Sequence, residues 1–150
     1  MDKKLVLIVD DSELDAKLTM MTIKEGLFAC DMVHLMDGQD LLDLLTCKSA
    51  FTQRKMEENK SICLILLDIN TARISGFDAL ETIKLNLELK DIPVVMLTTS
   101  DYARDLDQSY QLGANSYIVK DFDFEKLQSD ITGAAHYWLN INRRIKPKYC

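Results

Sequence analysis

The chain has 150 residues, 47% of them hydrophobic and 28% charged, and its formal net charge is −6. This length and composition predict one soluble domain with a full core. The negative charge argues against nucleic acid or an anionic membrane as the main partner, and no apolar run is long enough to span a bilayer.

The N-terminus and the cysteines favour a cytoplasmic protein. Residues 5–9 are apolar but are followed by two aspartates, a stretch too short and too acidic to be a signal peptide. The cysteines show neither close pairs nor metal-ligand spacing, so we interpret them as reduced thiols. They are Cys30, Cys47, Cys63 (predicted to lie in the core) and Cys150.

The first predicted strand, residues 5–9, ends at Asp10 and Asp11. Ser12 follows as a predicted N-cap, with Asp15 three residues later closing a capping box. Apolar residues at helical spacing then predict a helix that stops near Gly26. They form one row of Leu14, Leu18 and Met21 and a second row of Ala16, Met20 and Ile23.

The next elements are weaker. Residues 29–35 mix apolar and polar side chains, which is typical of a strand at a sheet edge. Asp37 is predicted to cap a second helix, with Asp40 three residues on and leucines at 41, 42, 44 and 45 as its apolar face. Residues 46–61 are polar and charged, and we predict a long surface connection there or an extension of the second helix.

An uninterrupted apolar run at 62–67 leads straight into Asp68. Such a run, with loop-forming stretches on either side, predicts a strand that is buried on both faces. A parallel sheet presents its functional groups at the carboxyl ends of its strands, so Asp68 is expected at the rim of the sheet. A lone aspartate in that place is a metal ligand, a nucleophile or a polar stop to the strand.

The second half of the chain repeats the alternation of strand and helix. Strands are predicted at 94–97, ending at Thr98, and at 117–119, ending at Lys120, with a polar helix at 103–112 between them. Helical spacing marks one helix by Phe77, Leu80, Ile83 and Leu87, and a last long helix by Phe124, Leu127, Ile131, Ala134, Ala135, Trp138 and Leu139. Five alternations predict an α/β domain with a five-stranded parallel sheet, a doubly wound three-layer sandwich.

Polar side chains at the predicted strand ends form one set: Asp10, Asp11, Asp68, Thr98 and Lys120. Each alone is common at a strand end, but in a parallel sheet all of them meet at one edge. Three carboxylates suit Mg²⁺, and a hydroxyl and an ammonium suit a phosphoryl group. The set therefore predicts phosphoryl transfer with an aspartate nucleophile. The two histidines, His34 and His136, have no such partners, and we interpret them as structural.

Over residues 4–140 the sequence resembles the receiver domain of two-component response regulators. The matching motifs are Leu-Ile-Val-Asp-Asp at 7–11, Leu-Ile-Leu-Leu-Asp at 64–68, Gly76, Pro-Val-Val-Met-Leu-Thr at 93–98, Gly-Ala at 113–114 and Tyr-Ile-Val-Lys at 117–120. The resemblance implies a flavodoxin-like (βα)5 strand order. It also implies that Asp68 accepts a phosphoryl group from a phosphohistidine of a sensor histidine kinase.

Further roles follow from the same resemblance. Asp11, Asp68 and the backbone carbonyl of Asn70 would bind Mg²⁺ (or Mn²⁺), with Asp10 acting partly through water, and Lys120 would pair with a phosphoryl or carboxylate oxygen. Thr98 would move towards the phosphoryl group and Tyr117 would change rotamer with it, unless the Tyr117 hydroxyl simply lies in water. The surface of the fourth helix, fifth strand and fifth helix would then change shape.

Two positions depart from the family pattern. Ala72 stands where a proline is usual four residues after the phosphoacceptor, and Asp121 stands where a proline usually follows the lysine. A cis peptide before a non-proline residue costs roughly 3–4 kcal/mol, so we expect a trans Lys120–Asp121 bond and a differently shaped loop.

The chain is expected to be a single receiver domain over 1–150, with a core at about 4–140, a basic tail at 141–150 and no output domain. The signal would leave by contact with a downstream protein. The 46–61 connection and the missing proline after Lys120 resemble single-domain regulators of phytochrome-type kinases. Tyr137, Trp138 and Leu139 are then candidate homodimer contacts, the alternative being that Trp138 packs on its own core.

Other function classes fit the sequence less well. An aspartate-nucleophile phosphohydrolase of the haloacid dehalogenase type needs a carboxylate two residues after Asp68, where this chain has Asn70. A flavin-binding module would meet repulsion between its phosphate and Asp10 and Asp11. A phosphate-independent receiver-like adaptor stays open as an alternative, although none of the acidic residues or the lysine is lost. A receiver would have at most self-phosphorylation and autodephosphorylation activity.

Overall fold

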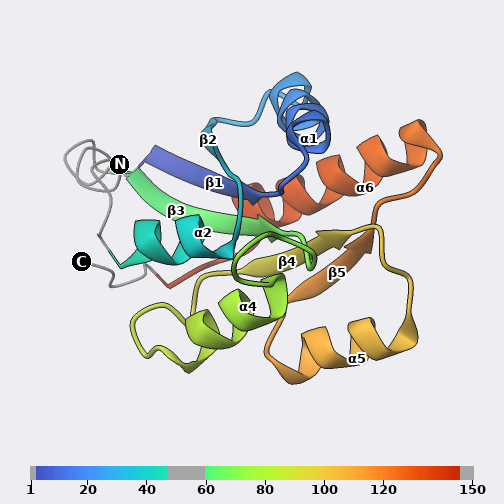
Figure 1. The fold of residues 1–150 in the computed structure, drawn as a ribbon. Helices are drawn as coiled ribbons and strands as arrows, with labels where there is room; N and C mark the ends of the chain where they lie inside the picture. The colour runs from blue at the N-terminus through green and yellow to red at the C-terminus, as the bar shows by residue number, and fades with distance from the viewer. Residues whose placement is uncertain (1–2, 47–59, 146–150) are drawn as a thin grey trace.

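The computed structural model describes residues 3–46 and 60–145, which form a parallel sheet with helices on both faces (Figure 1). The described elements confirm the predicted α/β alternation. In chain order they are β1 (Lys3–Val9), α1 (Glu13–Glu25), β2 (Cys30–Leu35), α2 (Gly38–Leu45), β3 (Lys60–Leu67), α4 (Gly76–Leu85), β4 (Val94–Thr98), α5 (Ala103–Gln111), β5 (Ser116–Val119), α6 (Phe124–His136) and a π-helical turn η1 (Tyr137–Ile141).

The sheet has five strands in the order β2-β1-β3-β4-β5, and every described pairing is parallel. The predicted edge strand β2 is at the edge, and the flavodoxin-like order is confirmed. The chain changes direction across the sheet between β1 and β3, and ligands of open α/β sheets bind outside the strand ends at such a point. Val9 pairs with Leu67 and Thr98 with Val119, so the residues that follow these four reach the same edge together.

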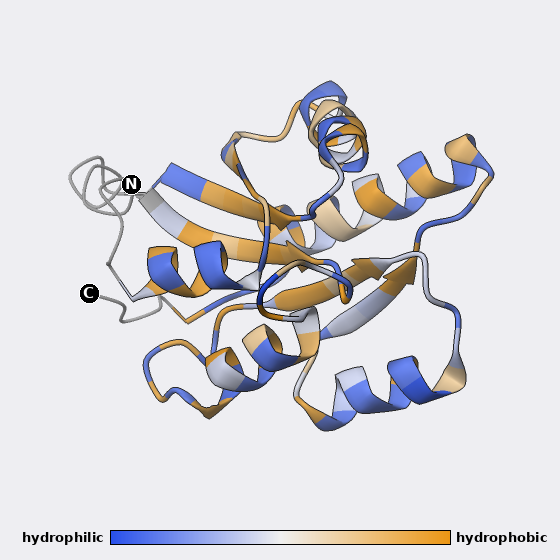
Figure 2. Cartoon of the chain, in the orientation of Figure 1, coloured by the Kyte–Doolittle hydropathy of each residue, from blue (hydrophilic) through white to orange (hydrophobic). Residues whose placement is uncertain are grey.

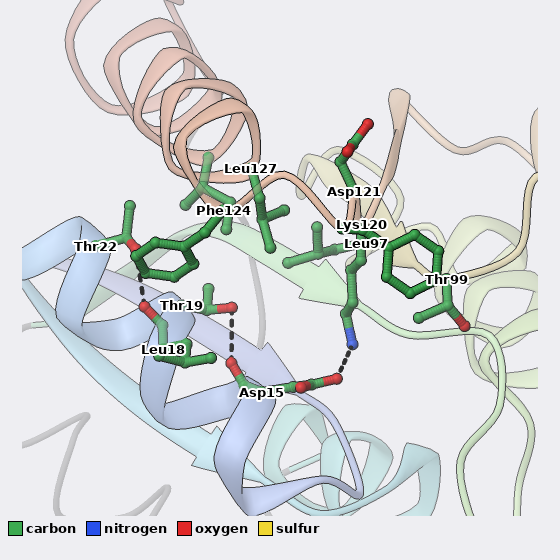
Figure 3. Close-up of a pocket in the computed structure, with 12 residues that line it drawn as sticks. Asp15, Leu18, Thr19, Thr22, Leu97, Thr99, Lys120, Asp121, Phe124 and Leu127 are labelled. Carbon is green, nitrogen blue, oxygen red and sulfur yellow. Dashed lines mark hydrogen bonds and ion pairs between the residues drawn. The ribbon is translucent and has the colours of Figure 1, made fainter.

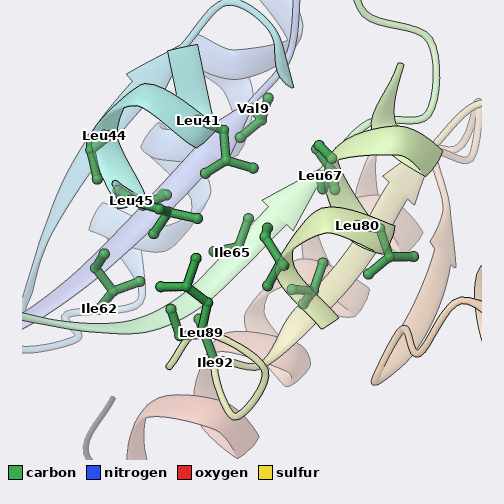
Figure 4. Close-up of a cluster of buried hydrophobic side chains, with 14 of the residues drawn as sticks. Val9, Leu41, Leu44, Leu45, Ile62, Ile65, Leu67, Leu80, Leu89 and Ile92 are labelled. Carbon is green, nitrogen blue, oxygen red and sulfur yellow. The ribbon is translucent and has the colours of Figure 1, made fainter. Parts of the chain in front are cut away.

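Two hydrophobic clusters fill the space between the sheet and its helices. Alternate residues of β1 and β3 face α2 and α4 on one side, and the intervening residues face α1 and α6 on the other. Figure 2 shows the central strands mainly in the hydrophobic colour, and Figure 4 shows the leucines of α2 packed over β1 and β3. Residues 62–67 are at most 3% exposed, which confirms a strand buried on both faces and places Cys63 in the core.

Helix α1 forms as predicted and buries the row of Ala16, Met20 and Ile23, but not the row of Leu14, Leu18 and Met21. Leu14 and Met21 are exposed, whereas Thr19 and Thr22 are buried with Ala16 and Ile23. The hydroxyl of Thr19 donates to the carbonyl of Asp15 at 3.0 Å, and that of Thr22 donates to the carbonyl of Leu18 at 2.8 Å. Because these hydroxyls are satisfied inside the helix, threonine can be buried there. A count of apolar residues alone finds Ala16 and Ile23 on this face but misses the two threonines.

Two predicted helix N-caps are confirmed, but only one of the two bonds of the capping box predicted at Ser12 is formed. The side chain of Asp37 accepts from the backbone N–H of Asp40 at 3.0 Å, and Ser12 Oγ accepts from the N–H of Asp15 at 3.2 Å. The reciprocal bond of the predicted capping box is absent among the described contacts, because the N–H of Ser12 donates to Asp10 Oδ1 at 2.9 Å. The carboxylate of Asp15 is therefore available for another partner.

Two expectations for the later helices are wrong in detail. Leu87 lies beyond α4 and is exposed, and Leu89 occupies the core in its place. Phe124 begins α6 but is 47% exposed.

Helix α2 ends at Leu45, and the rest of the predicted connection at 47–59 lies outside the described residues, as do residues 146–150 of the tail. In the described part of the chain, no helix combines the length and the hydropathy that a membrane crossing requires.

Candidate functional site

The ends of β1 and β3 bring three carboxylates together. The N–H of Asp68 donates to the carbonyl of Val9 at 3.0 Å, which continues the strand pairing one residue past the end of β3. As a result, one carboxylate oxygen each from Asp10, Asp11 and Asp68 all lie within 4.8 Å of one another. Asp10 and Asp68 are nearly buried and Asp11 is exposed, so the cluster opens to solvent on one side.

The ammonium of Lys120 closes the buried side of this cluster. The N–H of Lys120 donates to the carbonyl of Thr98 at 2.7 Å, and its Nζ lies 2.5 Å from Asp10 Oδ2 and 3.2 Å from Asp68 Oδ2. A third carboxylate, Asp15 Oδ2 on α1, lies 3.1 Å from the same Nζ. Sequence reasoning missed Asp15 as a site residue because its position favoured a capping role.

One ammonium therefore faces an excess of negative charge. Burial lowers the pKa of Lys120, but its hydrogen bond to Asp10 and the charge of Asp68 outweigh burial and raise that pKa above its ordinary value. Burial raises the pKa of Asp10, although Lys120 and the N–H of Ser12 partly oppose this. Lys120 is thus firmly charged, but its single positive charge is shared among Asp10, Asp15 and Asp68 and does not balance their combined negative charge.

The donor set fits a hard divalent cation. Carboxylate oxygens are the ligands that Mg²⁺ takes in proteins, usually one or two of them together with water and phosphate oxygens. The exposed side of the cluster gives such an ion access to Asp11 and to solvent. The N–H of Asn70 donates to Asp68 Oδ1 at 3.4 Å, which ties the backbone of Asn70 to the cluster. Its carbonyl as a metal ligand stays a prediction.

Asp11→Asn is expected to raise the melting temperature in metal-free buffer and to reduce the rise that Mg²⁺ produces. The substitution removes like-charge repulsion at about 5 Å, worth about 1 kcal/mol near water. It also removes a predicted metal ligand, and a bound ion stabilises a fold by an amount that rises with the logarithm of its affinity. Thermal melts with EDTA and with Mg²⁺ measure both effects, and Glu13→Gln on α1 is the control. A variant that Mg²⁺ stabilises as much as the wild type would exclude Asp11 as a ligand.

The loop from Asn70 to Gly76 is held without the usual proline. Arg73, at φ 62°, donates from Nε to Asp37 Oδ2 at 2.7 Å and from Nη2 to Asp37 Oδ1 at 3.0 Å. This bidentate pair ties the loop after β3 to the start of α2. A Cβ on Gly76 would lie 2.2 Å from the carbonyl oxygen of Asp68, so only glycine fits eight residues after that aspartate.

Thr98 and Tyr117 are linked through Ser100. The N–H of Ser100 donates to Thr98 Oγ1 at 3.4 Å, and the hydroxyl of Tyr117 donates to the carbonyl of Ser100 at 2.9 Å. Thr98 is fully buried and the ring of Tyr117 packs against the core cluster of β1 and β3. The alternative in which the Tyr117 hydroxyl simply lies in water is therefore wrong for this structure.

The loop after Lys120 has the expected trans peptide, since the described residues contain no cis bond. Asp121 Oδ1 accepts from the N–H of Asp123 at 2.8 Å, and Asp123 in turn caps α6. This turn, built on an aspartate side chain, replaces the shape that a proline would impose. Lys120 still reaches Asp68 at 3.2 Å, as the prediction required.

The remaining predicted residues lie away from the carboxylates or support them from behind. His34 Nε2 lies 2.7 Å from the carbonyl oxygen of Asp10, a backbone contact that fits the structural interpretation. Leu139 is 4% exposed in its own core and Trp138 packs against that core. Tyr137 is 45% exposed and meets Trp138 edge to face at 4.9 Å. Tyr137 is thus the exposed member of the three predicted dimer contacts.

Comparisons with known proteins point in the same direction as the geometry. The sequence profile described as "Response regulator receiver domain" matches residues 6–132. Response regulator Rcp1 of Synechocystis sp. is 34% identical over 136 residues, which cover 91% of this chain and 89% of Rcp1.

Solved structures are similar over nearly the whole chain. The Mn²⁺-bound form of Rcp1 superposes with a TM-score of 0.82 at 31% identity, covering 95% of this chain and 99% of that one. The phosphorylated cyanobacterial phytochrome response regulator RcpA superposes with a TM-score of 0.83 at 30% identity, covering 96% and 99%. Rcp1 therefore holds a divalent metal and RcpA a phosphoryl group on a fold similar to this one.

Proposed function

The chain belongs to the response regulator receiver family of two-component systems, and on that premise we propose that Asp68 accepts a phosphoryl group from a phosphohistidine in a Mg²⁺-dependent reaction. Two solved structures with a similar fold are bacteriophytochrome response regulators, so the proposed donor is a sensor histidine kinase of the phytochrome type. The observation that carries the proposal is the Lys120 ammonium between Asp10 and Asp68, beside a solvent-facing carboxylate cluster.

In the proposed transfer an Asp68 carboxylate oxygen forms a bond to phosphorus while the phosphorus–nitrogen bond of the phosphohistidine breaks. The electron pair of that bond stays on the departing imidazole. Asp10, Asp11, Asp68 and the Asn70 carbonyl would hold Mg²⁺, which when bound offsets the negative charge of the transferring group. Lys120 donates to a phosphoryl or carboxylate oxygen. Because the Lys120 side chain is buried, water screens its positive charge little, and the charge stabilises the transferring group strongly.

Phosphorylation places close to two negative charges at the sheet edge. Thr98 Oγ1 accepts from Ser100, so its own proton is available to donate to a phosphoryl oxygen. Movement of Thr98 would pull on Ser100 and hence on the hydroxyl of Tyr117. We propose that the face made of α5, β5 and α6 carries this change to a downstream protein, and that exposed Tyr137 is a contact in a homodimer.

The phosphorylation step is tested with phosphoramidate or acetyl phosphate and read by intact mass. The expected result is a gain of one phosphoryl group per chain with Mg²⁺ and none with EDTA. A phosphate-independent adaptor would gain nothing from either donor. An aspartate-nucleophile phosphohydrolase would instead release phosphate continuously from a stable ester such as p-nitrophenyl phosphate. Either of these two outcomes would contradict the proposal.

A further inference from the structure

The ammonium of Lys120 has no donor to spare. A lysine ammonium has three N–H donors. The Nζ of Lys120 is within hydrogen-bond distance of three carboxylate oxygens, at 2.5 Å from Asp10, 3.1 Å from Asp15 and 3.2 Å from Asp68. If Lys120 is to donate to a phosphoryl oxygen on Asp68, one of these contacts has to be given up.

The contact to Asp15 is the least costly to release. The side chain of Asp15 is 39% exposed, against 5% for Asp10 and 12% for Asp68. Water can solvate the Asp15 carboxylate after release, whereas the Asp10 carboxylate would lose its partner in a less hydrated place. Asp68 itself would carry the phosphoryl group that Lys120 has to reach. An ion pair with one exposed member is also the weaker one, since water screens it.

The backbone of α1 fixes Asp15 in reach of Lys120 and leaves its carboxylate without a capping task. The N–H of Asp15 donates to Ser12 Oγ, and its carbonyl accepts from the hydroxyl of Thr19. The N–H of Ser12 is already used by Asp10 Oδ1, so the Asp15 carboxylate does not bond back to it. The main chain of Asp15 is thus held at two points while its side chain is directed to another element.

A pocket between α1 and α6 gives the released groups room. It has a volume of about 270 Å³, and both Asp15 and Lys120 line it. Figure 3 shows the ion pair at one end of this pocket, with Leu18, Phe124 and Leu127 among the other side chains that line it. Open volume therefore lies beside both partners of the ion pair.

We propose that Asp15 is a positioning residue for Lys120. Its carboxylate holds the Lys120 ammonium in the unphosphorylated state and competes with the phosphoryl group for that ammonium. The inference rests on the proposed function, because it assigns Asp15 a part in the same phosphoryl site. Asp15 touches neither the phosphorus nor the metal in this account and acts through Lys120. Its effect is to make the phosphorylated state less favourable.

The test is the affinity for beryllofluoride, a mimic of an aspartyl phosphoryl group, at saturating Mg²⁺. Asp15→Asn is expected to bind beryllofluoride about two- to five-fold more tightly than the wild type, the range that corresponds to one partly exposed ion pair. Asp15→Glu keeps a carboxylate and is expected to restore wild-type affinity. Glu13→Gln is the charge control, because Glu13 lies on the same helix but takes part in none of the described ion pairs. This variant is expected to bind beryllofluoride as tightly as the wild type.

The outcomes separate this inference from the proposed function. A wild-type chain that does not bind beryllofluoride contradicts the proposed function itself. A wild-type chain that binds, with Asp15→Asn equal to it or weaker, overturns only the role of Asp15. Equal tightening by Asp15→Asn and Glu13→Gln would also overturn it, because the effect would then be one of diffuse charge.

A measurement without ligand or metal tests the ion pair directly. In metal-free buffer, Asp15→Asn removes a partner of Lys120 in the wild-type background. In a Lys120→Met background the same substitution removes only a negative charge that repels the carboxylates of Asp10 and Asp68. The change in melting temperature is therefore expected to be more positive in the Lys120→Met background than in the wild type. Equal changes in both backgrounds would contradict a contact through Lys120.

Discussion

Asp68→Ala and Asp68→Asn are expected to abolish phosphoryl uptake. In the wild type the Asp68 carboxylate lies at the end of β3 and is nine-tenths buried. Its Oδ1 accepts from the N–H of Asn70, and its Oδ2 accepts from the ammonium of Lys120. Neither an alanine methyl group nor an asparagine amide supplies an anionic oxygen that can attack phosphorus. The expected effect is a complete loss of the mass gain that phosphoramidate and Mg²⁺ produce in the wild type.

The two substitutions also separate chemistry from folding. Asparagine keeps the size of Asp68 and removes a like charge from the cluster with Asp10 and Asp11, so the Asn variant is expected to be folded at room temperature. Circular dichroism verifies that fold beside the mass measurement. A folded Asp68→Asn chain that still gains one Mg²⁺-dependent phosphoryl group would contradict the assignment of the acceptor.

Lys120→Met is expected to destabilise the metal-free protein and to suppress phosphorylation. The side chain is 8% exposed and lies between two nearly buried carboxylates, Asp10 and Asp68. Removing one partner of a buried charge cluster leaves unpaired carboxylates and costs about 3 kcal/mol. For a chain of this size that is a fall of about 6–12 °C in melting temperature.

The pH dependence follows from the shifted pKa of Lys120. Its pKa in the folded protein is raised, so its stabilising effect is complete below the unfolded value, about 10.4, and is lost only as pH rises through the folded value. The deficit of Lys120→Met is therefore expected throughout neutral pH. It should shrink in acid, where Asp10, whose pKa is raised by burial, becomes protonated.

Lys126→Met provides a matched control for Lys120→Met. Lys126 is exposed and pairs only across one helical turn with Asp130 at 2.7 Å in the described contacts. Such a pair contributes little, so this variant should melt close to the wild type. Equal losses in the two variants, or no loss for Lys120→Met, would contradict the role given to Lys120 as the cation of the cluster.

The sheet and its edge were predictable because they depend on local patterns. Apolar runs such as 62–67 are long enough to specify strands, and the alternation with helices leaves few topologies. Once the strands are parallel, Asp68 and Lys120 are brought to one edge by chain connectivity alone. Their mutual distance of 3.2 Å is a consequence of that edge and of β5 pairing with β4.

Contacts between elements distant in sequence were not predictable in this way. Asp15 gave a capping signal in sequence, and only the packing of α1 against β1 and α6 brings its carboxylate to Lys120. Arg73 has no local motif, yet it holds the loop after β3 through Asp37, 36 residues away. The buried threonines on α1 were not predicted either, because a count of apolar residues leaves out threonines whose hydroxyls donate to carbonyls of their own helix.

The end of the last helix was unpredictable for a related reason. Helical spacing continues through Trp138 and Leu139, but residues Tyr137–Ile141 widen into a π-helical turn. The ammonium of Lys4, on β1, donates to the carbonyl of Leu139 there. A contact between the two ends of the chain thus shapes a segment whose own sequence indicates an ordinary helix.

The most direct test of the central claim is to locate the acyl phosphate. The protein is phosphorylated with Mg²⁺ and phosphoramidate, reduced with borohydride, which converts a phosphorylated aspartate to homoserine, and sequenced by tandem mass spectrometry. Homoserine is expected at position 68 alone, with none when EDTA replaces Mg²⁺. Homoserine at Asp10, Asp11 or Asp15 in place of Asp68, or a phosphoryl group that borohydride does not reduce, would contradict it.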